Sequence, residues 1–233
     1  MDKRQELILK TIIKEHIKTG APVGSEVLVE KYKMDISPAT ARNEMSVLEN
    51  EGYIRQPHTS AGRVPTEKAY KYYLENLQAS SEKSTQKKDN SVFNDLEKTL
   101  AKRNEQSFKE ASKIMAVFSG NAVFWAFHRH NLYYTGIANL FVQPEFSELS
   151  TIYDISAVID HIDEIINEIF EKVGKGVEVL IGSENPFGNL CSTILAKYRL
   201  NDQTGLFGII GPMRMNYEKN IKLVEFVNKT LSH

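Results

Sequence analysis

The sequence predicts an α+β fold in which two structural units are joined by a polar linker. Residues 1–77 show three short amphipathic helical patterns followed by a hairpin pattern and a fourth helix. Residues 78–90 contain no large apolar side chain and are rich in Ser, Lys and Gln, so they cannot form a core. Residues 91–233 mix strand-like and helical patterns, which is typical of a sheet with flanking helices.

Length and composition limit the classes of protein to which the chain can belong. Its 233 residues suffice for two modest domains, and 41% hydrophobic with 25% charged residues is typical of soluble globular proteins. We find neither an export signal nor an apolar run long enough to span a membrane. The single cysteine, Cys191, excludes an internal disulfide and a cysteine zinc site. We therefore expect a cytoplasmic protein without membrane contact.

The first unit begins with two predicted helices. Apolar residues at positions 9, 12, 13 and 17 share one helical face, and Gly20 with Pro22 ends that helix. Ser25 is expected to cap a short second helix, with Val27, Leu28 and Tyr32 on its inner face.

The third predicted helix and the residues that follow it indicate the type of domain. Ser37 followed by Pro38 is a strong helix start, and Gly52 supplies the stop. Residues 53–55 and 63–64 then predict two strands around a polar loop, before a helix over residues 66–77. Three helices followed by a hairpin describe a winged helix-turn-helix domain.

A helical wheel of the third helix predicts a face that could read DNA. Ala41, Met45 and Leu48 face inward, which leaves small and polar residues outward that can enter a major groove. Asn can pair there with adenine, Arg can contact guanine or phosphate, and helix N-terminal groups suit phosphate. An ordinary solvated helix face is an equally good interpretation of any single residue. The candidates on this helix are Ser37, Ala39, Thr40, Arg42, Asn43 and Ser46.

The hairpin adds four further candidates, His58, Thr59, Ser60 and Arg63. A polar loop of this kind can follow the DNA backbone and place Arg63 in or beside the minor groove. In the alternative interpretation, Arg63 pairs with a nearby carboxylate in an ordinary surface hairpin. The helix and the hairpin together favour DNA binding over that alternative.

The net charge of −1 argues at first against a nucleic-acid partner. Residues 1–78 hold 12 basic against 11 acidic side chains, residues 79–113 hold 8 against 6, and residues 114–233 hold 9 against 13. The acidic excess therefore lies in the second half. A DNA-binding face in the first half must come from the arrangement of a few residues, because bulk positive charge is absent.

The stretch from Ser37 to Leu74, and QPHTSAGRVPT within it above all, resembles the signature of the HrcA family of bacterial heat-inducible transcription repressors. Three later stretches, GIANLFVQPEF, VLIGSENP and GIIGPMRMNY, are similar to blocks of that family in the same order. The resemblance implies a homodimer that binds double-stranded DNA at an inverted-repeat operator of chaperone genes (the CIRCE element). It also implies a nucleoid-associated location, a chaperonin partner and a GAF-like second domain.

The chain departs from the family by a deletion, since members carry an inserted dimerisation domain for which there is no room here. We expect the domains to be 1–77 for DNA binding, 78–90 as linker and 91–233 as a truncated GAF-like domain for sensing and dimerisation. The apolar surfaces of a long helix over residues 92–118 and of the sheet are our hypothesis for the dimer interface.

The second half of the sequence shows few residues that indicate metal binding or catalysis. His128 and His130 could share a strand face, but they lack a third metal ligand at a telling spacing, and we predict no metal, no cofactor and no catalytic residue. Cys191 and Trp125 are interpreted as core residues. An alternative function is a GAF-like module that senses a small molecule or a protein and acts on a different operator.

Overall fold

The computed structural model describes residues 1–59, 61–78, 89–128, 131–146, 156–200 and 203–232. The chain divides into two compact units, residues 1–82 and 83–233, each with its own core. Among the described helices, none combines the length and the apolar character needed to cross a membrane.

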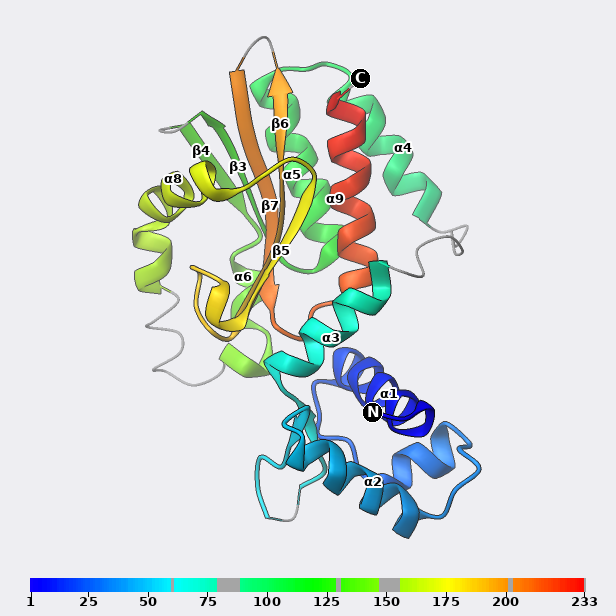
Figure 1. Ribbon diagram of the computed structural model, residues 1–233. Coiled ribbons are helices and arrows are strands. Elements are labelled where there is room, and N and C mark those ends of the chain that lie inside the picture. The colour runs from blue at the N-terminus through cyan, green and yellow to red at the C-terminus, as the bar shows by residue number, and fades with distance from the viewer. Residues whose placement is uncertain (60, 79–88, 129–130, 147–155, 201–202, 233) are drawn as a thin grey trace. The chain divides into compact units, whose positions relative to one another are not determined.

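The first unit is built mainly from helices (Figure 1). They are α1 (Lys3–Thr19), the short π-helical segment η1 (Val27–Lys31), α2 (Pro38–Asn50) and α3 (Glu67–Gln78). The strands β1 (Ile54–Arg55) and β2 (Val64–Pro65) pair antiparallel between α2 and α3. As predicted, α1 ends at Gly20, which adopts a left-handed conformation with φ 69°.

The core of this unit follows the predicted helical faces. Ile8, Leu9, Ile12 and Ile13 of α1 are fully buried, and Leu28 of η1 is buried with them. Tyr32, predicted to face inward, is instead 38% exposed, because its hydroxyl donates to the Glu15 carboxylate rather than entering the apolar core. The remaining buried apolar residues are Val23, Ala41, Met45, Leu48, Ile54, Ala69, Tyr70 and Tyr73.

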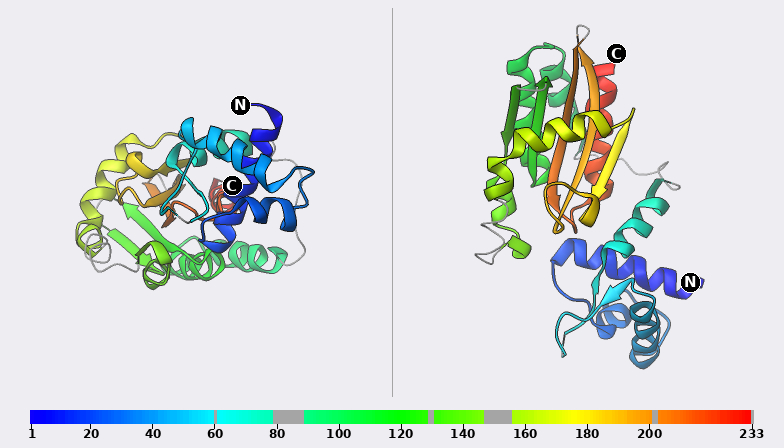
Figure 2. Two further views of the ribbon diagram at one scale, coloured as in Figure 1. Left: turned by 90° about the horizontal axis from the view of Figure 1, so that it is seen from below. Right: turned by 60° about the vertical axis from the view of Figure 1, so that its left-hand side comes forward.

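The second unit is built on a five-stranded antiparallel sheet in the order β4-β3-β7-β6-β5 (Figures 1 and 2). The strands are β3 (Ala122–His128), β4 (Asn131–Thr135), β5 (Val177–Ile181), β6 (Cys191–Leu200) and β7 (Gln203–Pro212). Strand patterns over residues 191–199 and 205–210, on either side of a polar turn, predict a hairpin, and β6 and β7 form it and pair over their whole length. The sequence pattern over residues 176–181 predicts a buried strand, but β5 is only half-buried, because it pairs with β6 alone at the edge of the sheet.

Helices cover both faces of this sheet. One face carries α4 (Asp89–Leu100), α5 (Glu105–Ser119) and α9 (Tyr217–Ser232), while α6 (Ala138–Phe141) and α8 (Ile162–Lys172) pack on the other. Two short 3-10 segments, η2 (Pro144–Phe146) and η3 (Gly182–Glu184), complete the unit. Residues 156–160 are helical as well. The sequence pattern predicts helical stretches across residues 146–173, of which residues 147–155 lie outside the described residues.

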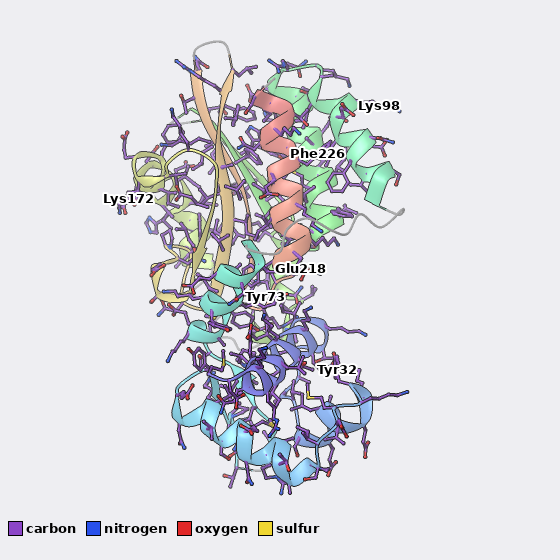
Figure 3. All side chains as sticks on the ribbon, turned by 45° about the vertical axis from the view of Figure 1, so that its right-hand side comes forward. Tyr32, Tyr73, Lys98, Lys172, Glu218 and Phe226 are labelled. Carbon is purple, nitrogen blue, oxygen red and sulfur yellow. The ribbon has the colours of Figure 1, made fainter. Side chains whose placement is uncertain are left out.

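The long helix predicted over residues 92–118 is wrong, because the chain turns between α4 and α5. Arg103 has a positive φ of 46°, and the side chain of Asn104 accepts the Ser107 amide to start a new helix. Phe93 on α4 then packs edge-on against Phe226 on α9, with ring centroids 4.8 Å apart. Figure 3 labels Phe226 on α9 and Lys98 on α4. α4 therefore packs against α9 within the second unit.

The sheet face below α5 has an aromatic centre. Trp125 is fully buried and stacks on Phe108 at 4.9 Å and on Phe207 at 4.8 Å between ring centroids. Tyr198 meets Trp125 edge-on at 5.5 Å. The interpretation of Trp125 as a core residue is confirmed.

Candidate nucleic-acid interface

The start of α2 has the predicted capping geometry. Ser37 is the N-cap, and its Oγ accepts the Thr40 amide at 3.1 Å, while Pro38 occupies the first turn. The hydroxyls of Ser37 and Thr40 lie 2.9 Å apart. The two hydroxyls are thus fixed at the positive end of the helix, where a phosphate would be favoured.

The outward side of α2 is polar and open. Ala41, Met45 and Leu48 are buried as predicted, while Ser37, Ala39, Arg42, Asn43 and Ser46 are exposed and Thr40 is half-buried. Ser46 donates its hydroxyl back to the Arg42 carbonyl. Within the described part of the chain, the side chains of Arg42 and Asn43 make no hydrogen bond or ion pair, so both are available to a ligand.

The hairpin is attached to the helical core through a third segment. Val23 and Arg63 exchange two backbone hydrogen bonds of 2.8 and 2.9 Å, which extends the β1–β2 pair by one bridge. This close approach requires glycine next to Arg63, since a Cβ on Gly62 would lie 2.5 Å from the backbone C and O of Val23. The backbone of the hairpin is therefore held against the segment that contains Val23.

The side chain of Arg63 lies against α2 and is bonded to a carboxylate there. Its Nε donates to Glu49 Oε2 on α2 at 2.9 Å, and its side chain is 17% exposed. The pairing with a nearby carboxylate, considered above as the alternative, is the arrangement found here. Of the other hairpin candidates, His58 and Thr59 are exposed, and Ser60 lies outside the described residues.

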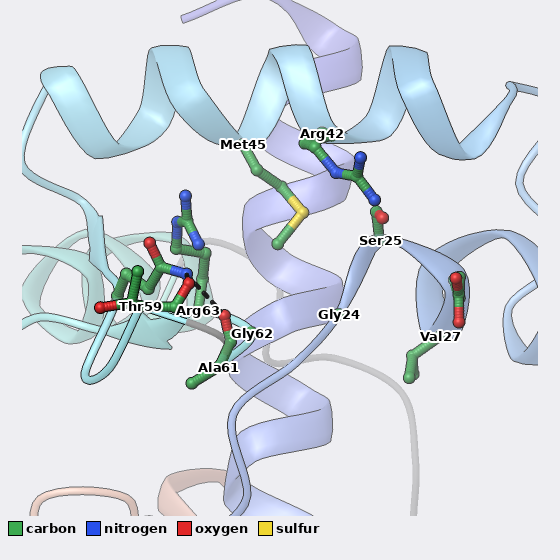
Figure 4. Close-up of a pocket in the computed structure, with 11 residues that line it drawn as sticks. Gly24, Ser25, Val27, Arg42, Met45, Thr59, Ala61, Gly62 and Arg63 are labelled. Atoms are coloured by element: carbon green, nitrogen blue, oxygen red, sulfur yellow. Dashed lines mark hydrogen bonds between the residues drawn. The ribbon is translucent and has the colours of Figure 1, made fainter.

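A cavity of about 470 Å³ lies between α2, the residues before η1 and the hairpin (Figure 4). Arg42 and Met45 enter it from the helix, and Thr59 and Arg63 line it from the hairpin. The other lining residues are Gly24, Ser25, Glu26, Val27, Gln56, Ala61 and Gly62. Of the candidate residues, Arg42 from the helix and Thr59 and Arg63 from the hairpin thus line one concave surface.

An ion pair fixes η1 against α1. The Glu15 carboxylate accepts from Lys31 Nζ and from the Tyr32 hydroxyl, the latter at 2.6 Å. Hydrogen bonds from Lys31 and then Tyr32 lower the pKa of Glu15, and the same carboxylate raises the pKa of Tyr32 to about 12. This network sets the position of the segment that precedes α2.

Two further residues of α2 and the hairpin were not among the candidates from the sequence. Arg55 on β1 is exposed and has no side-chain partner among the described residues, and the alternation of Ile54 inward with Arg55 outward could have indicated it. Glu49 was missed because nothing in the sequence links it to Gln56 and Arg63, which it contacts.

The second unit shows little that could support catalysis. No group of three His, Cys, Asp or Glu side chains that could hold a metal occurs among the residues described, and the His128 side chain and His130 fall outside that set. Burial raises the pKa of the Cys191 thiol to about 12, so the thiolate is scarce at neutral pH. A smaller cavity of about 280 Å³ is lined by Glu105, Phe108, Phe127, Asn131, Tyr198, Leu200 and Gln203.

Comparison with known proteins gives the family. The family model described as "HrcA protein C terminal domain" matches residues 58–221, most of the chain. The chain belongs to the HrcA family.

Curated relatives named "Heat-inducible transcription repressor HrcA" match along the full length. The protein of Carboxydothermus hydrogenoformans is 28% identical, with 100% of this chain and 97% of the relative covered. That of Natranaerobius thermophilus is also 28% identical, with 98% and 95% covered.

A solved structure supports the fold. The crystal structure of a hypothetical protein superimposes on the chain with a TM-score of 0.80, covering 100% of this chain and 98% of the other at 19% identity. The alignment with the Carboxydothermus HrcA protein spans 333 positions, against 233 residues here, so at least 100 positions of that alignment have no counterpart in this chain. This agrees with the expected deletion.

Proposed function

We propose that the protein is a transcription repressor of heat-shock genes whose first unit binds DNA as a winged helix. The observation that carries the proposal is that α2 and the hairpin line one concavity, to which Arg42 and Thr59 contribute, and that Asn43, Ser46 and His58 on the same two elements are exposed. The HrcA family membership, through relatives named heat-inducible repressors, supplies the regulated genes. The same evidence favours a binding protein over an enzyme.

In this proposal α2 enters the major groove. Arg42 and Asn43, which are exposed and unpaired among the described residues, contact base edges, and Ala39 and Ser46 allow close approach because they are small. Ser37 and Thr40 contact a phosphate at the helix start. The hairpin residues His58, Thr59 and Ser60 follow the backbone beside the minor groove.

We further propose the domain roles expected from the sequence. Residues 1–77 bind DNA, residues 78–90 link the units, and the GAF-like residues 91–233 mediate sensing and dimerisation in a cytoplasmic, nucleoid-associated protein. A dimer is required because one DNA-binding unit contacts only half of an inverted repeat. On α5, Val117 is 85% exposed, which supports a contact on this helix, although α4 and α5 do not form the single helix first expected.

The proposal is tested with a duplex that carries the CIRCE inverted repeat, in a gel-shift titration against a duplex of scrambled sequence. We expect retardation of the first duplex only. Arg42→Ala should weaken binding by about 1–3 kcal/mol, whereas the matched control Arg199→Ala, an exposed arginine of the second unit, should leave it unchanged. Equal binding of both duplexes would refute the proposal.

Dimerisation and the chaperonin are tested separately. Light scattering at tens of micromolar should give the mass of a dimer, and a monomer with and without operator DNA would exclude our model of operator binding. Footprints on the organism's chaperone promoters should become stronger when chaperonin is added. Unchanged footprints would remove the chaperonin from the proposal.

The small cavity of the second unit favours a second candidate function. Three aromatic rings, Phe108, Phe127 and Tyr198, line it together with polar side chains, which is typical of sites for small organic ligands. A sensing module with a different operator would show a ligand-dependent rise in unfolding temperature and no preference for the CIRCE duplex.

A further inference from the structure

One carboxylate of α2 holds both arms of the hairpin. Glu49 Oε1 accepts the backbone amide of Gln56, directly after β1, at 3.0 Å. Glu49 Oε2 accepts from Arg63 Nε, directly before β2, at 2.9 Å. The two arms are therefore fixed to the same helical side chain, and the contact to Arg63 is charge-assisted.

The Gln56 side chain extends this connection across the loop. Its Nε2 donates to the carbonyls of Thr59 and Ala61, both at 2.9 Å. β1 and β2 have two residues each, and a hairpin this short is not stable by itself in water. The position of the loop beside α2 must therefore depend on these side-chain contacts and on the Val23 bridge.

We propose that Glu49 is a positioning residue for DNA binding and that Arg63 acts through Glu49 rather than by contacting a DNA groove. The inference rests on the proposed function. Arg63 Nε is held by Glu49, and only 17% of the Arg63 side chain is exposed, so little of the guanidinium is presented to a DNA groove. Glu49 carries a negative charge, so its benefit to DNA binding must come from the position that it gives the hairpin.

A double-mutant cycle distinguishes positioning from groove contact because the two models predict opposite effects at Glu49. With positioning, Glu49→Ala and Arg63→Ala each weaken binding to the CIRCE duplex, roughly three- to tenfold, and the double variant is no weaker than the worse single variant. If Arg63 instead contacts DNA after release from Glu49, Glu49→Ala binds equally or more tightly, since it frees the guanidinium and removes a negative charge. That result would overturn the inference.

Glu51→Ala is the matched control. Glu51 is an exposed glutamate at the end of the same helix, and its side chain makes no contact with the hairpin in the described structure. Its removal deletes the same charge, so it should leave binding unchanged or slightly tighter. Glu49→Gln keeps an oxygen for the Gln56 amide and should lose less than Glu49→Ala.

Hydrogen exchange on the free protein supplies a readout that does not depend on DNA. Faster exchange of the Gln56 amide in Glu49→Ala, with α1 unchanged, is expected if Glu49 fixes the hairpin. Unchanged exchange at Gln56 would contradict the inference even if DNA binding fell. If the parent protein does not prefer the CIRCE duplex, the proposed function fails, and the exchange data alone decide whether Glu49 holds the hairpin.

Discussion

Replacing Gly62 with alanine tests how the hairpin is joined to the helical core. An added Cβ would lie 2.5 Å from the backbone C and O of Val23, whereas ordinary contacts of a Cβ lie at 3.4–4 Å. The obstructing atoms are backbone, so the two segments must separate. The two hydrogen bonds between Val23 and Arg63, of 2.8 and 2.9 Å, would then be lost or stretched.

The magnitude follows from these contacts. Two hydrogen bonds contribute about 1 kcal/mol each. Alanine restricts the unfolded chain more than glycine does, which returns about 0.4–1 kcal/mol. We therefore expect Gly62→Ala to lower the free energy of unfolding of the first unit by about 1–2 kcal/mol and to weaken operator binding.

Gly24→Ala is the control, because an added Cβ there meets no atom within 4 Å and Gly24 lies next to Val23. It should leave stability unchanged or slightly raised. Urea unfolding followed by hydrogen exchange of α1 amides measures both variants in the full chain. A Gly62→Ala protein as stable as Gly24→Ala would refute the steric reasoning.

Three further predictions concern the cap, an acid-sensitive pair and the thiol. Ser37→Ala removes the N-cap of α2 and should cost about 1 kcal/mol in urea unfolding, and an unchanged midpoint would contradict the capping role. The folded pKa of Glu15 lies below its usual value of 4.5, so its stabilising effect is complete at neutral pH and is lost as the pH falls through and below that value. Glu15→Gln should therefore show a smaller loss of stability on acidification than the parent. Cys191 is buried with a pKa of about 12, so a thiol reagent should label it only after unfolding, and rapid labelling at neutral pH would disprove its burial.

Local signals in the sequence predicted much of the first unit. Ser37 with Pro38, and the glycines at 20 and 52, act over one helical turn, so the ends of α1 and α2 could be located without knowing the fold. The inward residues of α2 were predicted for the same reason, since helical periodicity is a local property.

Contacts between distant segments could not be predicted in this way. Val23 joins the hairpin across 40 positions, and Glu49 reaches Arg63 across 14, which no periodic pattern encodes. The break between α4 and α5 was missed because Leu100 and Phe108, eight positions apart, keep the helical phase across the polar residues 102–107. Arg103 in a left-handed conformation and the Asn104 cap nevertheless end one helix and begin the next there. The outward side chains of α2 could be predicted from the sequence, but the means by which the hairpin is held could not.

The stacked Trp125 gives the molecule an intrinsic optical probe of one unit. It is the only tryptophan in the sequence, and it lies fully buried between Phe108 and Phe207 in the second unit. Its fluorescence will therefore change when that sheet opens to water, and it reports on the second unit, because the first unit, for which we propose DNA binding, contains no tryptophan. Heating the protein while recording tryptophan emission and operator occupancy together would show which unit responds first to temperature.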